Sequence, residues 1–384
     1  MKKHLILSLL LAFFLTLASA TQTTAQVSVF ETEATTRFID IGVDRASNDV
    51  VLVGVESIDG TDTASVYNLS ADRSSFNRET LVGLGSETTV NGISPDGSRI
   101  AGTSQVTANR SEGTTWISSA PDSPTGIGLI PRDGIFFGPS SSSSGVAAWS
   151  GGIVGTIEGG DFQPEDGAYR WEPNEISAIS ILVEGDVTGV SGDGSLFIAS
   201  ESDFGATIFG PSGNQTNFSN ARFESISPNG SFIGGTLVID PFAQIWIQDD
   251  SGEYVATSIL RQDENTNSLE EIFGSVLDVS DSGYALIDTG NEILIWNESF
   301  NGIDSEFIGA QNFNEWILAS GGTQLSTQIT GIAGIAEQDG ALLFAVNGDD
   351  RAFVVSVSTV PEPSSAAILL FAASIGAIQR RRRL

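Results

Sequence analysis

Apolar and polar positions alternate in short runs along most of the chain, and Gly, Asn, Asp or Pro interrupts each run after a few residues. This pattern is typical of strands joined by tight turns, because successive side chains of a strand point to opposite faces. No long segment keeps the 3.6-residue period of an amphipathic helix, and Gly, Ser, Thr, Val and Ile are abundant. We therefore expect an all-β fold.

A short string recurs through this pattern. Residues 90–103 read VNGISPDGSRIAGT, and the sequence contains similar strings at 187–199, 223–235, 276–287 and 331–346 and weaker copies at 44–55 and 144–156. Each copy is interpreted as strand, tight turn, strand, since Gly tolerates positive φ and Asn or Asp bonds its own backbone. A Gly within the second strand indicates close backbone approach between neighbouring sheets.

The spacing of the copies predicts the architecture. Their turns fall at residues 49, 97, 151, 194, 230, 283 and 340, about 48 residues apart. A large residue follows each turn after 13 to 20 positions, in the order Tyr67, Trp116, Trp171, Phe209, Trp246, Trp296 and Val355. A hairpin, a strand with a large residue and a fourth strand make one unit, and seven units fill residues 27–358. We predict a seven-bladed β-propeller, with six or eight blades, or two stacked sandwiches, as alternatives.

The first 26 residues have the form of a secretory signal peptide. Lys2, Lys3 and His4 precede an apolar stretch at 5–17, and Ala18-Ser19-Ala20 follows it. Small residues at Ala18 and Ala20 are the pattern that a signal peptidase cleaves, so we expect cleavage after Ala20, with Ala25 as the second choice. An uncleaved anchor is the alternative.

The last 26 residues, 359–384, contain three parts in a fixed order. Pro361, Glu362 and Pro363 precede an apolar stretch at 366–378, and a basic cluster follows: Arg380, Arg381, Arg382 and Arg383. Thirteen helical residues span about 20 Å, short of a ~30 Å bilayer core, but snorkelling arginines can supply part of the difference. The arginines favour the cytoplasmic side, which leaves the body outside. An ordinary terminal helix with a basic tail is the alternative.

This end, over residues 360–384, resembles the PEP-CTERM sorting signal of exported Gram-negative bacterial proteins. The resemblance implies that an exosortase removes the tail and that the body reaches the cell surface or extracellular matrix, where such proteins accompany exopolysaccharide. The recurring string also resembles the HAF-type repeat of some exported bacterial proteins. That second resemblance covers most of the body and implies no activity.

The charge of the chain and the residue types that it lacks exclude several classes of function. Acids outnumber bases 48 to 17 over 384 residues, and residues 27–359 hold 47 acids and 11 arginines, a net charge of −36. Such a surface repels nucleic acid. The chain has no Cys, and its one His and both Lys lie within the first four residues. Once that segment is removed, the remaining chain has no His, Lys or Cys. It therefore cannot form a Ser-His-Asp triad, a Cys nucleophile, a Schiff-base lysine, a His or Cys zinc site or a P-loop.

Candidate ligand residues are few. Trp116, Trp171, Trp246 and Trp296 recur at one structural phase, which favours packing between blades. Trp149 and Trp316 fall outside that phase, so they are the better candidates for exposed sugar platforms, although core packing remains the favoured alternative for each.

Acid-rich segments are also weak candidates. The turns at 249–253 and 347–350 could hold calcium, but solvated hairpin tips explain them more simply. Residues 263–268 begin like an EF-hand loop, yet Ser268 and Gly274 replace its Gly and Glu. For glycosidase chemistry, which needs two carboxylates, the least implausible cluster is Asp161, Glu165 and Asp166, and no catalytic pair is named.

These observations favour an exported, non-catalytic surface or matrix protein whose propeller binds extracellular polysaccharide or a surface partner. Signal peptidase and exosortase would process it, the C-terminal helix would hold the precursor in the inner membrane, and no cofactor is expected, with calcium left open. The alternatives are a carboxylate-dependent polysaccharide hydrolase on the same scaffold and a purely structural coat component. Carboxylates together with aromatics at the central mouth would favour the hydrolase.

Overall fold

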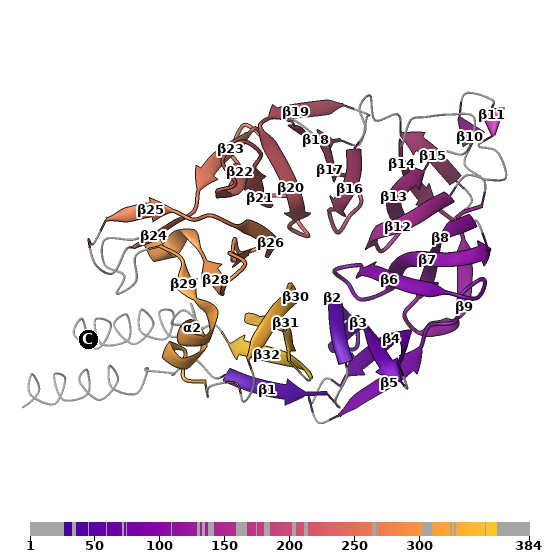
Figure 1. Ribbon diagram of the computed structural model, residues 1–384, viewed down its shortest axis with the longest axis horizontal. Helices are drawn as coiled ribbons and strands as arrows, with labels where there is room; N and C mark the ends of the chain where they lie inside the picture. Colours follow the sequence, from indigo (N-terminus) through magenta and orange to yellow (C-terminus); the bar gives the residue numbers. More distant parts are fainter. Residues whose placement is uncertain are drawn as a thin grey trace, which may run out of the picture.

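The computed structural model describes residues 27–358 except 33–35, 45, 59, 71–72, 74, 109, 129–130, 133–134, 137–141, 159–166, 174, 180–184, 202–204, 211–213, 263–265, 267, 302–308, 323–324, 326–327 and 350. Within these residues, seven four-stranded antiparallel sheets form a ring (Figure 1). The predicted seven-bladed β-propeller is therefore confirmed. The predicted signal peptide with Ala18 and Ala20, and the tail with Pro361, Glu362, Pro363 and Arg380–Arg383, lie outside the described residues.

In the first six blades, chain order runs from the innermost strand to the outermost. Blade 1 contains β2 (Thr36–Asp44), β3 (Asp49–Ile58), β4 (Thr61–Leu69) and β5 (Phe76–Thr80). Blade 2 contains β6 (Thr88–Ile93), β7 (Arg99–Thr107), β8 (Arg110–Ile117) and β9 (Ala120–Gly126). Blade 3 contains β12 (Ser142–Trp149), β13 (Gly152–Glu158), β14 (Gly167–Glu172) and β15 (Glu175–Ile179).

Blade 4 contains β16 (Gly185–Val190), β17 (Phe197–Glu201), β18 (Gly205–Phe209) and β19 (Gln215–Ser219). Blade 5 contains β20 (Ala221–Ile226), β21 (Phe232–Leu237), β22 (Ala243–Gln248) and β23 (Tyr254–Ser258). Blade 6 contains β26 (Ser275–Val279), β27 (Ala285–Asp288), β28 (Ile293–Trp296) and β29 (Gln311–Asn312).

Blade 7 closes the ring with both ends of the body. It contains β30 (Ile329–Gln338), β31 (Ala341–Gly348) and β32 (Ala352–Ser358), and β1 (Val27–Glu31) adds its outermost strand. Val27 pairs with Val357, and Ala341 pairs with Ser358. Both ends of the described chain therefore lie beside the turn between β30 and β31. We call the face that carries the turns between first and second strands the mouth face, and the opposite one the distal face.

The recurring string forms the turn between the first and second strands. In blade 5, Ser227 Oγ donates to Asn229 Oδ1 at 2.9 Å and accepts from the Phe232 backbone N–H at 3.0 Å. Gly230 takes a φ of 76°, which a side chain would strain. Ser94, Ser191 and Ser280 make the corresponding bonds to backbone N–H groups. The repeat is thus a structural turn whose serine hydroxyl bonds within it.

The second sequence signal marks the third strand of every blade. The residues that follow each turn all lie there and are buried: Tyr67, Trp116, Trp171, Phe209, Trp246, Trp296 and Val355. The second-strand glycines make close approaches both within their own blade and to the next one. A Cβ on Gly102 would lie 2.2 Å from the Thr89 carbonyl, and one on Gly235 would lie 2.0 Å from the Arg222 carbonyl. A Cβ on Gly145 of blade 3 would lie 2.6 Å from the Gly102 carbonyl oxygen, so the predicted close backbone approach between neighbouring sheets is confirmed at Gly102.

A few elements leave the ring on the connections between strands or blades. They are the hairpins β10 (Pro131–Arg132) with β11 (Ile135–Phe136) and β24 (Leu260–Gln262) with β25 (Leu269–Glu271), the 3₁₀ turn η1 (Glu298–Asn301) and the helix α2 (Phe313–Ala319). Asn312 caps α2, because its Oδ1 accepts from the Asn314 and Glu315 N–H groups. No helix among the described residues is long and apolar enough to cross a membrane. The predicted tail helix lies beyond them.

Candidate functional site: the central channel

The innermost strands surround a cavity of about 630 Å³ on the ring axis. Each carries a β-bulge at the same repeat position, and the bulged residues all line the cavity: Ile39, Asn91, Val146, Thr188, Glu224, Leu277 and Ala333. A bulge bends its strand and turns side chains toward a new direction. The seven bulges therefore place the next residue of each strand at the channel wall.

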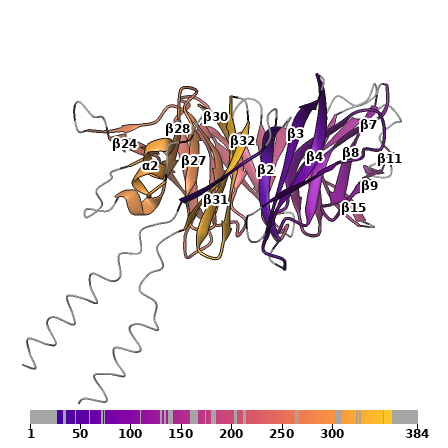
Figure 2. The ribbon, with the colours of Figure 1, turned by 90° about the horizontal axis from the view of Figure 1, so that it is seen from below.

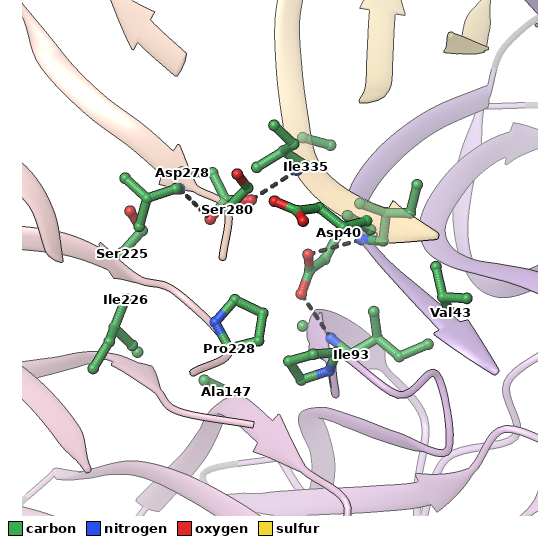
Figure 3. A pocket seen from close by; sticks show the side chains of 18 of the residues that line it. Asp40, Val43, Ile93, Ala147, Ser225, Ile226, Pro228, Asp278, Ser280 and Ile335 are labelled. Atoms are coloured by element: carbon green, nitrogen blue, oxygen red, sulfur yellow. Dashed lines mark hydrogen bonds between the residues drawn. The ribbon is translucent and has the colours of Figure 1, made fainter. Parts of the chain in front are cut away.

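Two of those next residues are aspartates, Asp40 in blade 1 and Asp278 in blade 6, and both line the channel (Figure 3). Asp40 Oδ1 accepts the Ile41 N–H at 2.7 Å, and its Oδ2 accepts the N–H of Ile93 in blade 2 at 2.8 Å. Asp278 repeats the arrangement. Its Oδ1 accepts from Val279 at 2.9 Å and its Oδ2 from Ile335 of blade 7 at 2.8 Å. Each carboxylate thus bonds its own blade to the next one.

Gly334 of blade 7 lies between the two carboxylates. A Cβ on Gly334 would lie 3.0 Å from Asp40 Oδ1 and 3.3 Å from Asp278 Oδ2. A side chain there would displace at least one of these acids, so the glycine makes room for the pair.

Burial in the channel, together with the Asp278 charge, raises the pKa of Asp40 to about 7. Burial also raises the pKa of Asp278 to about 7. In both cases the hydrogen bonds from backbone N–H groups lower the pKa and so oppose part of this increase. Near neutral pH, the pair is therefore close to the point at which protons leave it.

Other acids extend toward the mouth face. Asp281, Glu337 and Asp339 line the channel beside the turns, and Glu224 lies at the blade 5 bulge, where burial raises its pKa. No Arg, Lys or aromatic residue occurs among the described residues that line the cavity. Within the described chain, no three acids are grouped to hold a metal ion. The channel therefore has the carboxylates expected for a hydrolase but not the aromatics.

The two predicted platforms are both inside the protein. Trp149 is 3% exposed, packs against the blade 4 turn at Gly194, and has Arg170 over its ring at 4.9 Å. Trp316 is 8% exposed on α2, 5.7 Å from the ring of Phe344. Neither ring is a surface platform, so the core alternative holds for both. These two residues fall outside the repeat position of the other tryptophans, because Trp149 ends an innermost strand and Trp316 lies on the inserted helix α2.

The acid-rich turns have structural roles where they are described. Asp249 Oδ1 accepts from the Ser251 and Glu253 N–H groups and closes a hairpin tip. Asn347 is buried, and its side chain exchanges two hydrogen bonds with the Phe38 backbone, at 2.8 and 2.9 Å. Asp161, Glu165 and Asp166 lie outside the described residues, as does most of 263–268.

The sequence reasoning missed Asp40 and Asp278, although a signal was present. When the repeats are aligned on their bulges, the position that holds Asp in blades 1 and 6 holds a small residue in the others: Gly92, Ala147, Gly189, Ser225 and Gly334. An acid at a position otherwise reserved for small residues would have identified the pair.

Comparison with known proteins gives fold likeness alone. No family model and no curated protein matches the chain. The β-propeller domain of the Trilobed protease from Pyrococcus furiosus is 11% identical, with a TM-score of 0.50 over 87% of this chain and 98% of that one. The β-propeller domain of Cps50 (Swd1) from Myceliophteria thermophila is 9% identical, with a TM-score of 0.49 over 87% and 99%. TolB from Acinetobacter baumannii is 14% identical, with a TM-score of 0.38, and the match spans 58% of this chain and 54% of TolB. The likeness to the Trilobed protease domain agrees with the propeller fold and shows the fold alone.

Proposed function

We propose that this is an exported surface or matrix protein of a Gram-negative bacterium, with a non-catalytic propeller that binds extracellular polysaccharide. Signal peptidase and an exosortase process its two ends. The observation that carries this proposal is the position of those ends: Val27 and Ser358 emerge at neighbouring positions of blade 7 on the mouth face. Both terminal segments can therefore be removed without breaking a strand of the ring.

The bonding of the channel carboxylates supports the interpretation that the propeller is not catalytic. A general acid or nucleophile needs an oxygen that faces its substrate. Both oxygens of Asp40 and of Asp278 already accept backbone N–H groups, and each side chain connects two blades. These acids act as braces of the ring.

A polysaccharide hydrolase is the second candidate. Two carboxyls that share a channel, each with a pKa raised to about 7, are an arrangement from which one acid and one base can arise. In that case the substrate would have to enter from the mouth face and displace the backbone bonds.

The test incubates purified residues 27–358, which include every strand of the ring, with the extracellular polysaccharide of the host. Size-exclusion chromatography then follows polymer and protein. We expect co-elution with a polymer of unchanged length. Polymer shortening that is lost in Asp278→Asn would establish the hydrolase instead. Separate elution would refute polysaccharide binding and leave the structural alternative.

A further inference from the structure

Exposed apolar side chains occur in the turn between β21 and β22 of blade 5 and on the connection from blade 5 to blade 6. Phe273 is 60% exposed, Leu269 is 48% exposed and Ile239 is 71% exposed. Phe242, three residues after Ile239, pairs with Phe273 through an isolated bridge, and their ring centroids are 4.4 Å apart. We call these four residues the distal row.

Two residues of the distal row, Leu269 and Phe273, lie on one extended segment, and Phe242 bridges to that segment from the turn between β21 and β22. Exposure alternates from Glu271 to Ile272 to Phe273, so Leu269, Glu271 and Phe273 point to the same side. Leu269 and Phe273 are therefore separated by roughly 13 Å at the rise of a strand, which is long enough to contact a short run of sugar rings.

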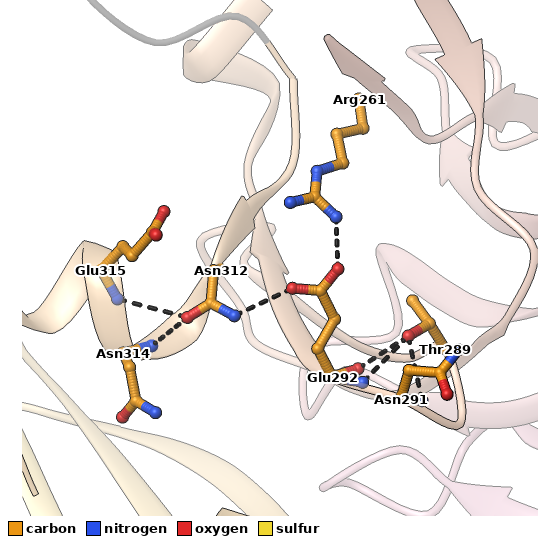
Figure 4. A network of polar contacts seen from close by, with 7 residues as sticks. All are labelled: Arg261, Thr289, Asn291, Glu292, Asn312, Asn314 and Glu315. Carbon is orange, nitrogen blue, oxygen red and sulfur yellow. Dashed lines mark hydrogen bonds and ion pairs between the residues drawn. The ribbon is translucent and has the colours of Figure 1, made fainter. Parts of the chain in front are cut away.

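Polar contacts fix this segment to the ring. The Ala243 N–H bonds the Ile272 carbonyl at 2.8 Å, and the Gly274 N–H bonds the Pro241 carbonyl at 3.0 Å. Behind them, Arg261 of β24 pairs with Glu292, which also accepts from the N-cap Asn312 at 2.9 Å (Figure 4). The row is therefore held in place before any ligand arrives, which lowers the entropy cost of binding.

The row faces away from the chain ends. Ile239 and Phe242 lie in the turn between β21 and β22, at the opposite end of β21 from the repeat turn at Ser227. The chain ends lie on the mouth face, and Figure 2 shows β24 toward the other face of the ring. A body attached to the cell surface at its processed C-terminal end would thus present the distal row outward.

The charges beside the row select the kind of partner. Asp240, Glu270 and Glu271 are exposed on the segments that carry it, and the Arg261 guanidinium pairs with Glu292. These acids and the net charge of −36 repel anionic polymers and a second copy of the chain. Sugar hydroxyls, in contrast, can donate to carboxylates while the ring faces cover their C–H groups. We propose that the distal row binds a neutral polysaccharide chain, an inference that rests on the proposed function and names its site.

The test separates the host polysaccharide into neutral and acidic fractions by anion exchange and measures binding of residues 27–358 by affinity electrophoresis. We expect wild type to bind the neutral fraction and Phe273→Ala to bind it about tenfold more weakly, because the ring loses its apolar contact area. Ile117→Ala is the matched control, since Ile117 is 42% exposed at the mouth-face end of β8. Thermal unfolding confirms that both variants keep the wild-type midpoint.

Each other outcome overturns the proposal in a recognisable way. Neutral binding that Phe273→Ala leaves unchanged would refute the site but keep the proposed function. Binding to the acidic fraction alone would refute the neutral partner. A dimer in solution that Phe273→Ala dissociates would make the row a self-interface. Absence of binding to either fraction would refute the proposed function as well.

Discussion

Replacing Asp278 by Asn tests whether the channel carboxylates control the pH dependence of stability. Asp278 bonds the N–H groups of Val279 and Ile335, and burial raises its pKa to about 7. In the unfolded chain, an aspartate titrates near its ordinary value of about 4. Between these values, the folded protein binds a proton that the unfolded chain has lost. The contribution of Asp278 to stability is therefore full below pH 4 and is lost as the pH rises through 7.

The magnitude follows from the same difference. An increase of the pKa from about 4 to about 7 sets a ceiling of about 4 kcal/mol for each carboxyl. Dielectric screening lowers the effect below this ceiling. Asp40 adds a second contribution of the same sign, and its increase includes the Asp278 charge. Asp278→Asn therefore removes one contribution and reduces the other, so at least half of the slope from the pair should disappear.

The assay is urea unfolding of wild type, Asp278→Asn and Asp40→Asn between pH 5 and 8. Asn keeps one acceptor but turns an NH₂ group toward a backbone N–H, so each variant should lose about 1–3 kcal/mol at pH 5. The informative quantity is the slope of the unfolding free energy against pH, which should be shallower in both variants than in wild type. Asp62→Asn, at an exposed position near the start of β4, is the control and should follow the wild-type slope. Equal slopes in wild type and Asp278→Asn would refute the reasoning.

Three further substitutions test the fold. Ser227→Ala removes the acceptor of the Phe232 N–H and should cost about 1–3 kcal/mol in urea unfolding, whereas the exposed Ser123→Ala should cost little. Asn347→Ala leaves the Phe38 N–H and carbonyl unpaired between blades 7 and 1 and should cost about 3 kcal/mol; limited proteolysis that finds no faster cleavage would contradict its role in closure. Trp316→Ala should cost about 3–5 kcal/mol of stability but leave polysaccharide affinity unchanged, and a loss of affinity in folded protein would restore Trp316 as a platform.

The fold was predictable because its signals are local and repeated. The Asp-Gly and Asn-Gly turns specify hairpins at a fixed spacing, and the large residues that follow them all lie on third strands. The closing strand β1 was not predictable in this way, since it pairs with β32 across the full length of the body. Helix α2 also escaped notice, because seven residues with a cap at Asn312 are too short to establish a period.

The candidate site was much less predictable. Asp40 and Asp278 are 238 positions apart in the sequence, and only closure of the ring brings them to either side of Gly334. Trp149 and Trp316 illustrate the opposite case, in which residue type suggested exposure while tertiary packing buried both rings. The phenylalanines of the distal row gave no pattern, because they lie in connections outside the repeat.

The two faces of the ring divide the properties that a tethered binding protein needs. The mouth face carries both chain ends and the acids Asp281, Glu337 and Asp339, and hydrogen bonds connect neighbouring turns there, as from Asn229 to Asp281 at 2.7 Å. The distal face carries the exposed side chains of Ile239, Leu269 and Phe273. Under the proposed function, attachment and recognition would use opposite ends of the same strands. The channel acids lie between the two faces and connect blade 6 to blade 7 and blade 1 to blade 2, on both sides of the junction at which the ring closes.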